Sequence, residues 1–165
     1  MPMEIERKFH VHRERLPRLD GGERYIQGYL QEDPQIRFRV IDGQTVVLCV
    51  KKFFAPGERF EFEAVRESAL PDDIEMLCRL ALWAPVIKTR HKFIGSDGFI
   101  WELDVYEGKN NGLITAEVET PSMDNPIQLP AWIDVEREIT QDSRYANLNL
   151  SRHPYSEWSE EEKKA

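Results

Sequence analysis

Apolar and ionisable residues alternate along most of this chain with a period of two, which is the period of a β-strand with one buried face. Residues 4–9 show the alternation clearly, because Ile5 and Phe9 share one face while two acids and a base share the other. The same alternation recurs in seven further segments, at residues 25–30, 36–41, 45–53, 59–65, 86–94, 99–106 and 113–120. Hairpin sequences such as Asp42-Gly43 separate neighbouring segments. The pattern therefore predicts eight antiparallel strands joined mainly by hairpins.

One segment between the strands has helical spacing instead, and it covers residues 71–83. Pro71 suits the first position of a helix, because the missing N–H of proline has no partner there in any helix. Apolar residues then recur every three or four positions, and Pro85 follows the last of them. The spacing predicts an amphipathic helix that packs against the apolar face of the sheet.

The last third of the chain is less regular. Residues 132–139 fit neither period clearly, and Asp142 can cap a short helix at residues 144–150. We expect one domain over residues 1–155, followed by a helical or frayed tail at residues 156–165.

The polar face of the predicted strands carries a regular set of ionisable groups. Its members are Glu4, Glu6, Lys8, Arg37, Arg39, Lys51, Glu61, Glu63, Lys88, Arg90, Lys92, Glu102, Asp104, Glu117 and Glu119. One interpretation is an open sheet whose charged face lies in water. An eight-stranded antiparallel sheet can instead close into a barrel, which removes its exposed edges. We expect the second arrangement: an α+β, predominantly β fold, with a closed eight-stranded antiparallel barrel around a charged tunnel and a few flanking helices.

Composition excludes several classes of function. The chain has 165 residues, of which 41% are hydrophobic and 32% charged, as in an ordinary globular domain. Its net charge of −8 argues against a general nucleic-acid binder, which needs many cations to meet phosphates. No apolar run reaches the roughly 20 residues of a membrane helix, and no secretion signal is recognisable, so we expect a cytoplasmic protein without a membrane partner. Cys49 and Cys78 lie in apolar contexts and are expected to be reduced core thiols.

The charges of the tunnel are segregated by strand, which suggests a ligand. A buried ion without a partner costs several kcal/mol or more, so opposed charges must compensate one another or a bound molecule. Guanidinium groups suit bidentate contacts to phosphate, and carboxylates are hard oxygen ligands for divalent cations. The pattern therefore favours a complex of a polyphosphate with Mg²⁺ or Mn²⁺.

At these positions the sequence resembles the CYTH family, also called the triphosphate tunnel metalloenzymes. The E-x-E-x-K signature of that family matches Glu4, Glu6 and Lys8. Further matches follow in order at Gln27-Gly28-Tyr29-Leu30, Arg37-x-Arg39, Lys51, Glu61-x-Glu63, Lys88-x-Arg90, Glu102-x-Asp104 and Glu117-x-Glu119. The resemblance implies a barrel that encloses a tunnel, a triphosphate substrate and dependence on a divalent metal. Arg152-His153-Pro154-Tyr155 adds similarity to the short bacterial tripolyphosphatase branch.

The tunnel and the resemblance together assign roles to the ionisable residues. The expected metal ligands are Glu4, Glu6, Glu102, Asp104, Glu117 and Glu119. The expected phosphate-binding residues are Lys8, Arg37, Arg39, Lys51, Lys88 and Arg90. The expected catalytic residues are Lys8, Tyr29, Glu61 and Glu63. Lys8 and Tyr29 form a dyad if the first two strands are neighbours, and Glu61 or Glu63 takes a proton from the attacking water or helps a metal to activate it.

Parity leaves one assignment open and settles two others. Lys52 competes with Lys51 for the inward position, because register across the preceding hairpin is not fixed, and we favour Lys51. Arg7 and His91 have outward parity, and we expect Arg7 to be a surface residue and His91 to be structural.

The function expected from these features is metal-dependent hydrolysis of a triphosphate, foremost inorganic tripolyphosphate to pyrophosphate and phosphate. Adenylate cyclase and thiamine triphosphatase activities are alternatives within the same family. A polyphosphate-binding module without turnover is the non-enzymatic alternative. The expected cofactor is Mg²⁺ or Mn²⁺, the expected partner is a small triphosphate, and the oligomeric state is left open, a homodimer included.

Overall fold

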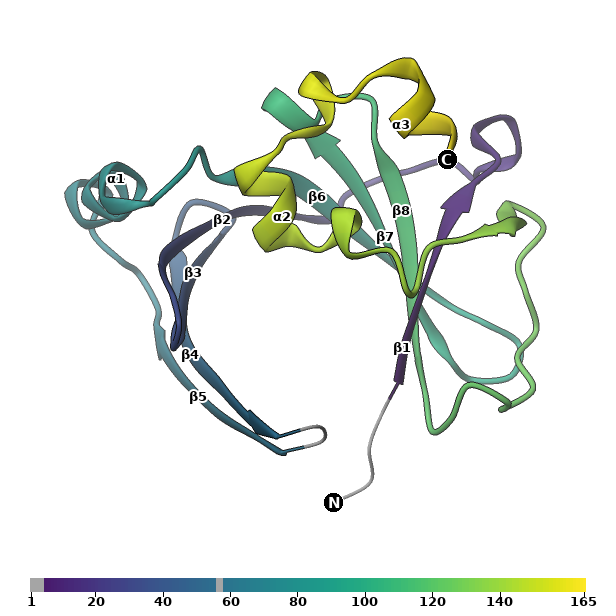
Figure 1. Ribbon diagram of the computed structural model, residues 1–165, viewed down its shortest axis with the longest axis horizontal. Coiled ribbons are helices and arrows are strands. Elements are labelled where there is room, and N and C mark those ends of the chain that lie inside the picture. Colours follow the sequence, from purple (N-terminus) through teal and green to yellow (C-terminus); the bar gives the residue numbers. More distant parts are fainter. Residues whose placement is uncertain (1–4, 56–57) are drawn as a thin grey trace.

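A computed structural model of the protein describes residues 5–55 and 58–165. Its main feature is one antiparallel sheet of nine strands, in the order β5-β4-β3-β2-β6-β7-β8-β1-β9. The strands are β1 (Ile5–Val11), β2 (Glu23–Glu32), β3 (Gln35–Ile41), β4 (Thr45–Ala55), β5 (Glu58–Arg66), β6 (Val86–Ile94), β7 (Ile100–Glu107), β8 (Ile114–Thr120) and β9 (Ile133–Glu138). Figure 1 shows that the sheet curves into an arc, with β5 near one end and β1 near the other.

Seven helical segments complete the described chain. They are η1 (Arg13–Arg15), α1 (Pro71–Leu80), η2 (Gly108–Asn110), η3 (Ser143–Tyr145), α2 (Asn147–Arg152), η4 (Tyr155–Glu157) and α3 (Glu160–Lys164). In Figure 1, α1 lies outside the arc. α2 and α3 belong to the C-terminal segment, residues 139–165, which lies across the top of the arc in this view. No helix in the described parts of the chain combines the length and apolar character needed to span a bilayer.

Closure of the sheet into an eight-stranded barrel is not confirmed. A ninth strand, β9, pairs with β1 at residues 9–11. β5 and β9 stand at the two ends of the strand order, and they do not pair with each other over the described residues. The order also shows that the first two strands are not neighbours, which was the condition for a dyad of Lys8 and Tyr29. β1 pairs with β8 and β9, whereas β2 pairs with β3 and β6. The physical reason is that residues 12–22, which include η1, lie between β1 and β2, so no tight hairpin joins these two strands and β1 can pair with a strand distant in sequence.

Local sequence explains most element boundaries. Asp42 and Gly43 both have positive φ, at 50° and 69°, as the two central residues of a tight β3–β4 hairpin require. Helix α1 begins at Pro71, as predicted, and ends at Leu80, three residues earlier than expected. The unassigned residues 132–139 contain β9. The tail is an ordered helix, α3, in which Ser159 and Glu162 form the full capping box.

The convex face of the sheet carries most of the apolar core in two clusters. One is centred on Phe9, Trp101 and Leu103, and the segments at residues 11–19 and 127–133 pack on it. The other is centred on Phe38 and Val40, and α1 packs on it. A third cluster lies on the concave side, where the C-terminal segment covers one end of the sheet. It contains Val86, Tyr106, Leu113, Ile139, Tyr145, Leu150 and Trp158. Helix packing thus leaves the rest of the concave face to polar groups.

Candidate active site

Strand register places the predicted ionisable residues on one face, the concave face. Directly opposed residues of an antiparallel pair point to the same side of a sheet. Register links the following pairs from β1 round to β5: Glu6–Glu119, Lys8–Glu117, Glu117–Glu102, Glu102–Lys92, Asp104–Arg90, Tyr106–Lys88, Lys88–Tyr25, Gln27–Arg39, Tyr29–Arg37, Arg37–Cys49, Cys49–Glu63 and Lys51–Glu61. The common face expected from parity is therefore confirmed for these residues. Glu4 lies outside the described residues.

The same register settles the open lysine assignment in favour of Lys51. Lys51 lies opposite Glu61 and has the parity of Arg37, so it belongs to the concave face. Lys52 points to the other side, where its ammonium contacts Asp33 at 2.7 Å.

The outward assignments of Arg7 and His91 are also confirmed. Arg7 lies opposite Val118, and its guanidinium donates to the carboxylate of Glu138 at 2.6 and 3.1 Å. Arg7 thus fastens β1 to β9 and is structural. His91 lies opposite Leu103 on the convex face.

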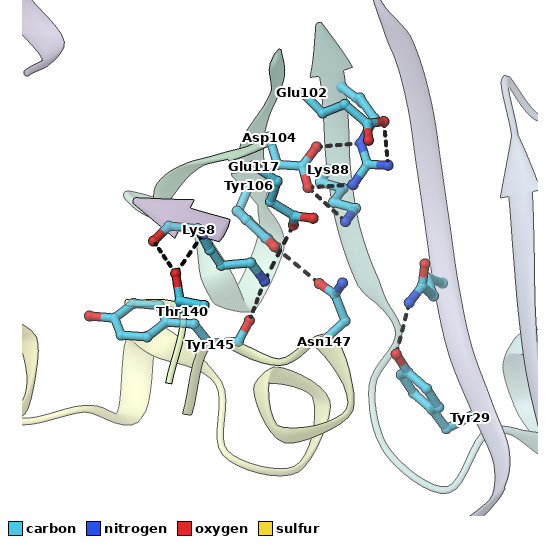
Figure 2. Close-up of polar contacts among 12 residues, drawn as sticks. Lys8, Tyr29, Lys88, Glu102, Asp104, Tyr106, Glu117, Thr140, Tyr145 and Asn147 are labelled. Carbon is cyan, nitrogen blue, oxygen red and sulfur yellow. Dashed lines mark hydrogen bonds and ion pairs between the residues drawn. The ribbon is translucent and has the colours of Figure 1, made fainter. Parts of the chain in front are cut away.

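Lys88 and Asp104, on β6 and β7, are the most buried charges of the site, and Arg90 on β6 pairs with Asp104. The side chains of Lys88 and Asp104 are both 0% exposed, and the ammonium of Lys88 donates to Oδ2 of Asp104 at 2.8 Å. Arg90 donates to both oxygens of Asp104, at 2.8 and 2.9 Å, and its Nη1 donates to Glu102 at 2.8 Å. Figure 2 shows Asp104 at the centre of this network, between Lys88 and Glu102. Asp104, predicted as a metal ligand, thus already uses both oxygens to hold two cations.

Burial and pairing shift the pKa values of this group in opposite directions. Burial lowers the pKa of Lys88 to about 7, and the carboxylate of Asp104 opposes that change. Burial alone would raise the pKa of Asp104, but Lys88 and the hydrogen bonds from Arg90 hold it well below its ordinary value. Burial also disfavours the charge of Arg90, yet its hydrogen bonds to Asp104 raise its pKa. Asp104 and Arg90 therefore stay ionised across the physiological range.

Lys8 connects the sheet to the C-terminal segment. Its ammonium donates to the backbone carbonyl of Tyr145 at 3.3 Å and lies 3.3 Å from Glu117 Oε1 (Figure 2). Burial lowers the pKa of Lys8, while the carboxylates of Glu6 and Asp104 oppose that change. The contact with Tyr145 could not be anticipated, because no motif marks the C-terminal segment as part of the site.

The condition for a dyad of Lys8 and Tyr29, that the first two strands are neighbours, is not met. β6, β7 and β8 separate β1 from β2 in the sheet. The hydroxyl of Tyr29 accepts a hydrogen bond from Gln27 at 2.8 Å, and Figure 2 shows its ring well away from Lys8. The catalytic role of each residue stays a prediction.

The cationic part of the concave face is centred on Arg37 and Arg39. Nε of Arg39 donates to Gln27 at 3.0 Å, and its guanidinium stacks on the ring of Tyr25 with 4.6 Å to the ring centroid. Arg90 lies over the same ring at 5.3 Å. Burial lowers the pKa of Arg39, and the charges of Arg37 and Arg90 lower it further.

Arg37 has unused hydrogen-bonding capacity. Its Nη2 lies 3.7 Å from Glu63, and its Nε is buried without a hydrogen-bond partner among the residues described. A buried donor without an acceptor is costly, which favours an anionic ligand here. Tyr25 is the residue of this part that sequence reasoning missed. Its parity with Gln27 and Tyr29 was the available signal.

Acidic groups occupy two parts of the concave face. Cys49, Glu61 and Glu63 have ligand atoms within 4.8 Å of one another, and they form the one such group found in the described part of the chain. The second part lies on β1, β7 and β8, where register opposes Glu6 to Glu119 and Glu102 to Glu117. Of the predicted metal ligands that the structure describes, Glu6, Glu102, Glu117 and Glu119 thus lie at adjacent positions of three neighbouring strands, and carboxylate oxygens are the donors that Mg²⁺ and Mn²⁺ prefer.

Comparison with known proteins places the chain in a family. It is 37% identical over 164 residues to an inorganic triphosphatase of Acetivibrio thermocellus, and the aligned region covers 97% of this chain and 100% of the relative. The crystal structure of the inorganic triphosphatase NE1496 matches with a TM-score of 0.67 and 32% identity, over 89% of this chain and 96% of that one. A second structure of NE1496, described as a hypothetical protein, gives a TM-score of 0.68 and 31% identity over 90% and 97% of the two chains. No family model matches the sequence.

These relatives share both the fold and nearly the full length of the chain. The protein belongs to the inorganic triphosphatase family. Both comparisons support the resemblance to the triphosphate tunnel proteins that the charged strands indicated.

Proposed function

We propose that the protein hydrolyses inorganic tripolyphosphate to pyrophosphate and phosphate on its concave face. The observation that carries the proposal is the buried Nε of Arg37, which has no acceptor among the described residues, beside Arg39 and within a family of triphosphatases. A phosphate oxygen would satisfy this donor. Two guanidinium groups and the ammonium of Lys51 would share the negative charge of the substrate.

The substrate would lie along β3, β4 and β6, with its charge distributed over several cations. Arg90 and Lys88 are held in place by Asp104, so their geometry is set before the substrate binds. Preorganised cations stabilise the charge of the transition state without first having to reorganise. We therefore assign Asp104 a positioning role in place of the predicted metal ligation.

The remaining acids would hold the cofactor. Glu6, Glu102, Glu117 and Glu119 are the side chains that would bind Mg²⁺ or Mn²⁺, which when bound would polarise phosphate oxygens and lower the pKa of a bound water. Glu61 and Glu63 lie on β5, on the same concave face, and would accept the proton of the attacking water. Attack at a terminal phosphorus breaks one P–O bridging bond, and pyrophosphate leaves.

A substrate panel tests this proposal. Phosphate release is measured from tripolyphosphate, pyrophosphate, thiamine triphosphate and ATP, each with Mg²⁺, with Mn²⁺ and with excess chelator, while cyclic AMP is followed in the ATP samples. We expect cleavage of tripolyphosphate well above the others, and none with chelator. Faster cleavage of an organic triphosphate, formation of cyclic AMP, or tight binding of tripolyphosphate without release would each overturn the proposal.

Arg37→Gln links the activity to the face described. Loss of one charge-assisted donor should raise the KM for tripolyphosphate about tenfold. Arg18→Gln is the matched control, because the side chain of Arg18 is 88% exposed and contacts only Asp20 among the described residues. Equal KM values for the two variants would remove Arg37 from the binding site.

A further inference from the structure

A short hydrogen-bond chain crosses from β3 to β2 on the concave face. Nε of Arg39 donates to Oε1 of Gln27 at 3.0 Å, and Nε2 of Gln27 donates to the hydroxyl of Tyr29 at 2.8 Å. The central residue is almost completely buried, since Gln27 is 1% exposed and Tyr29 is 4% exposed. Register brings the three together, because Gln27 lies opposite Arg39 and two residues before Tyr29.

The direction of each hydrogen bond in this chain is determined by chemistry. A guanidinium can only donate, so Gln27 must turn its carbonyl oxygen toward Arg39. The amide nitrogen of Gln27 then faces Tyr29, and because an amide nitrogen can only donate, the hydroxyl of Tyr29 must accept. A hydroxyl that accepts in this way still has its own hydrogen to donate. No other partner of the Tyr29 hydroxyl is found among the residues that the structure describes.

The same series of hydrogen bonds leaves part of the Arg39 guanidinium available to a ligand. Its Nε is engaged by Gln27, and its planar group rests on the ring of Tyr25. The two terminal nitrogens have no hydrogen-bond partner within the described chain. They form one edge of the guanidinium, which can meet two oxygens of one phosphate.

We propose that Gln27 is a positioning residue that turns the hydroxyl of Tyr29 into a hydrogen-bond donor for the triphosphate while it aims the terminal nitrogens of Arg39 at the same ligand. This inference rests on the proposed triphosphatase function. It makes Tyr29 a donor to a phosphate oxygen and excludes it as the base that deprotonates water. Burial raises the pKa of Tyr29, which agrees with a neutral phenol.

Two substitutions at Gln27 separate its two contacts. Gln27→Glu keeps an acceptor for Arg39 but has no donor, so the hydroxyl of Tyr29 turns to the new carboxylate and is lost to the substrate. Gln27→Met has a similar volume and removes both contacts. The added charge in Gln27→Glu would itself weaken binding of an anion, so each substitution is also made together with Tyr29→Phe, in which no effect through the Tyr29 hydroxyl can persist.

The measurements are kcat and KM for tripolyphosphate, the Kd of tripolyphosphate by calorimetry, and the melting temperature as a check on folding. We expect Gln27→Glu to lower kcat about tenfold in the parent protein and less than twofold in the Tyr29→Phe background. Its effect on KM should be the same in both backgrounds. Gln27→Met should raise KM in both backgrounds, because Arg39 loses its anchor.

Each result has a clear meaning. An equal loss of kcat in the two backgrounds, with folding intact, would overturn the inference and leave the proposed function standing. Failure of the parent protein to bind tripolyphosphate would overturn the proposed function and this inference with it, whereas binding without cleavage would overturn the proposed function alone. If tripolyphosphate binds without turnover, the same double-mutant comparison is read from Kd, and absence of coupling there overturns the inference.

Discussion

The network around Asp104 makes a strong prediction about stability. Asp104 is the anion that neutralises Lys88 and Arg90, and the side chains of Asp104 and Lys88 are both 0% exposed. Asp104→Asn keeps the shape of the side chain and removes its charge, so two cations lose their buried counter-charge. Breaking a buried ion pair in this way costs about 3–5 kcal/mol. Each kcal/mol lowers the melting temperature of a domain of this size by roughly 2–4 °C, so the expected decrease is about 6–20 °C.

Glu102→Gln is the matched control for that experiment. Its carboxylate also contacts Arg90, at 2.8 Å, but it makes one contact and its side chain is 24% exposed. Water can replace this interaction, so we expect a cost of about 1 kcal/mol or less. The assay is thermal unfolding followed by circular dichroism at neutral pH. Melting of Asp104→Asn within about 2 °C of the parent protein, or equal losses in both variants, would refute the view that Asp104 is the electrostatic centre of the site.

Further predictions follow from other contacts. Lys51→Gln should raise the KM for tripolyphosphate about tenfold, while Lys52→Gln, on the opposite face of the same strand, should leave it unchanged; equal values would contradict the register. Burial lowers the pKa of His10 from 6.5 to about 4, so the unfolded chain binds the proton more readily between these values. Stability should therefore fall as pH falls from 6.5 to 4, and His10→Gln should flatten this dependence in urea titrations; an unchanged slope would exclude His10 as its source. Arg144 donates to the carbonyls of Glu162 and Ala165, so Arg144→Gln should speed amide exchange in α3 about tenfold, and unchanged exchange would show that other contacts hold the helix.

Strand positions and the common charged face were predictable because they depend on local rules. Side chains alternate along a strand whatever the strand pairs with, so the parity of Arg37 and Arg39 or of Glu61 and Glu63 identifies their shared face before any pairing is known. Turn sequences such as Asp42-Gly43 likewise located the hairpins, although the register across that turn, and with it the choice between Lys51 and Lys52, was known only from the pairing of β3 with β4. The helix at Pro71 follows equally local signals.

Pairing between distant strands could not be obtained in this way. The place of β1 between β8 and β9, the absence of hydrogen-bonded closure among the described strands, and the separation of Lys8 from Tyr29 all depend on contacts between residues more than a hundred positions apart or on strand order. Alternation is the same for every partner, so it carries no information about which strand lies beside which.

The amino-acid sequence alone was enough to predict most side chains of the charged face and of the convex core clusters, because both depend on the strand period; Cys49 is an exception, since it was expected in the core and lies on the charged face between Arg37 and Glu63. Tertiary structure decided what those charges contact. In the folded protein, Asp104 accepts hydrogen bonds from Lys88 and Arg90, and the carbonyl of Tyr145 accepts one from Lys8. Gln27 joins Arg39 to Tyr29 by two further hydrogen bonds. The partner of a charged side chain can lie on the same strand, on a neighbouring strand or on a segment distant in sequence. Which of these groups comes within contact distance depends on the folded arrangement of the sheet and the C-terminal segment.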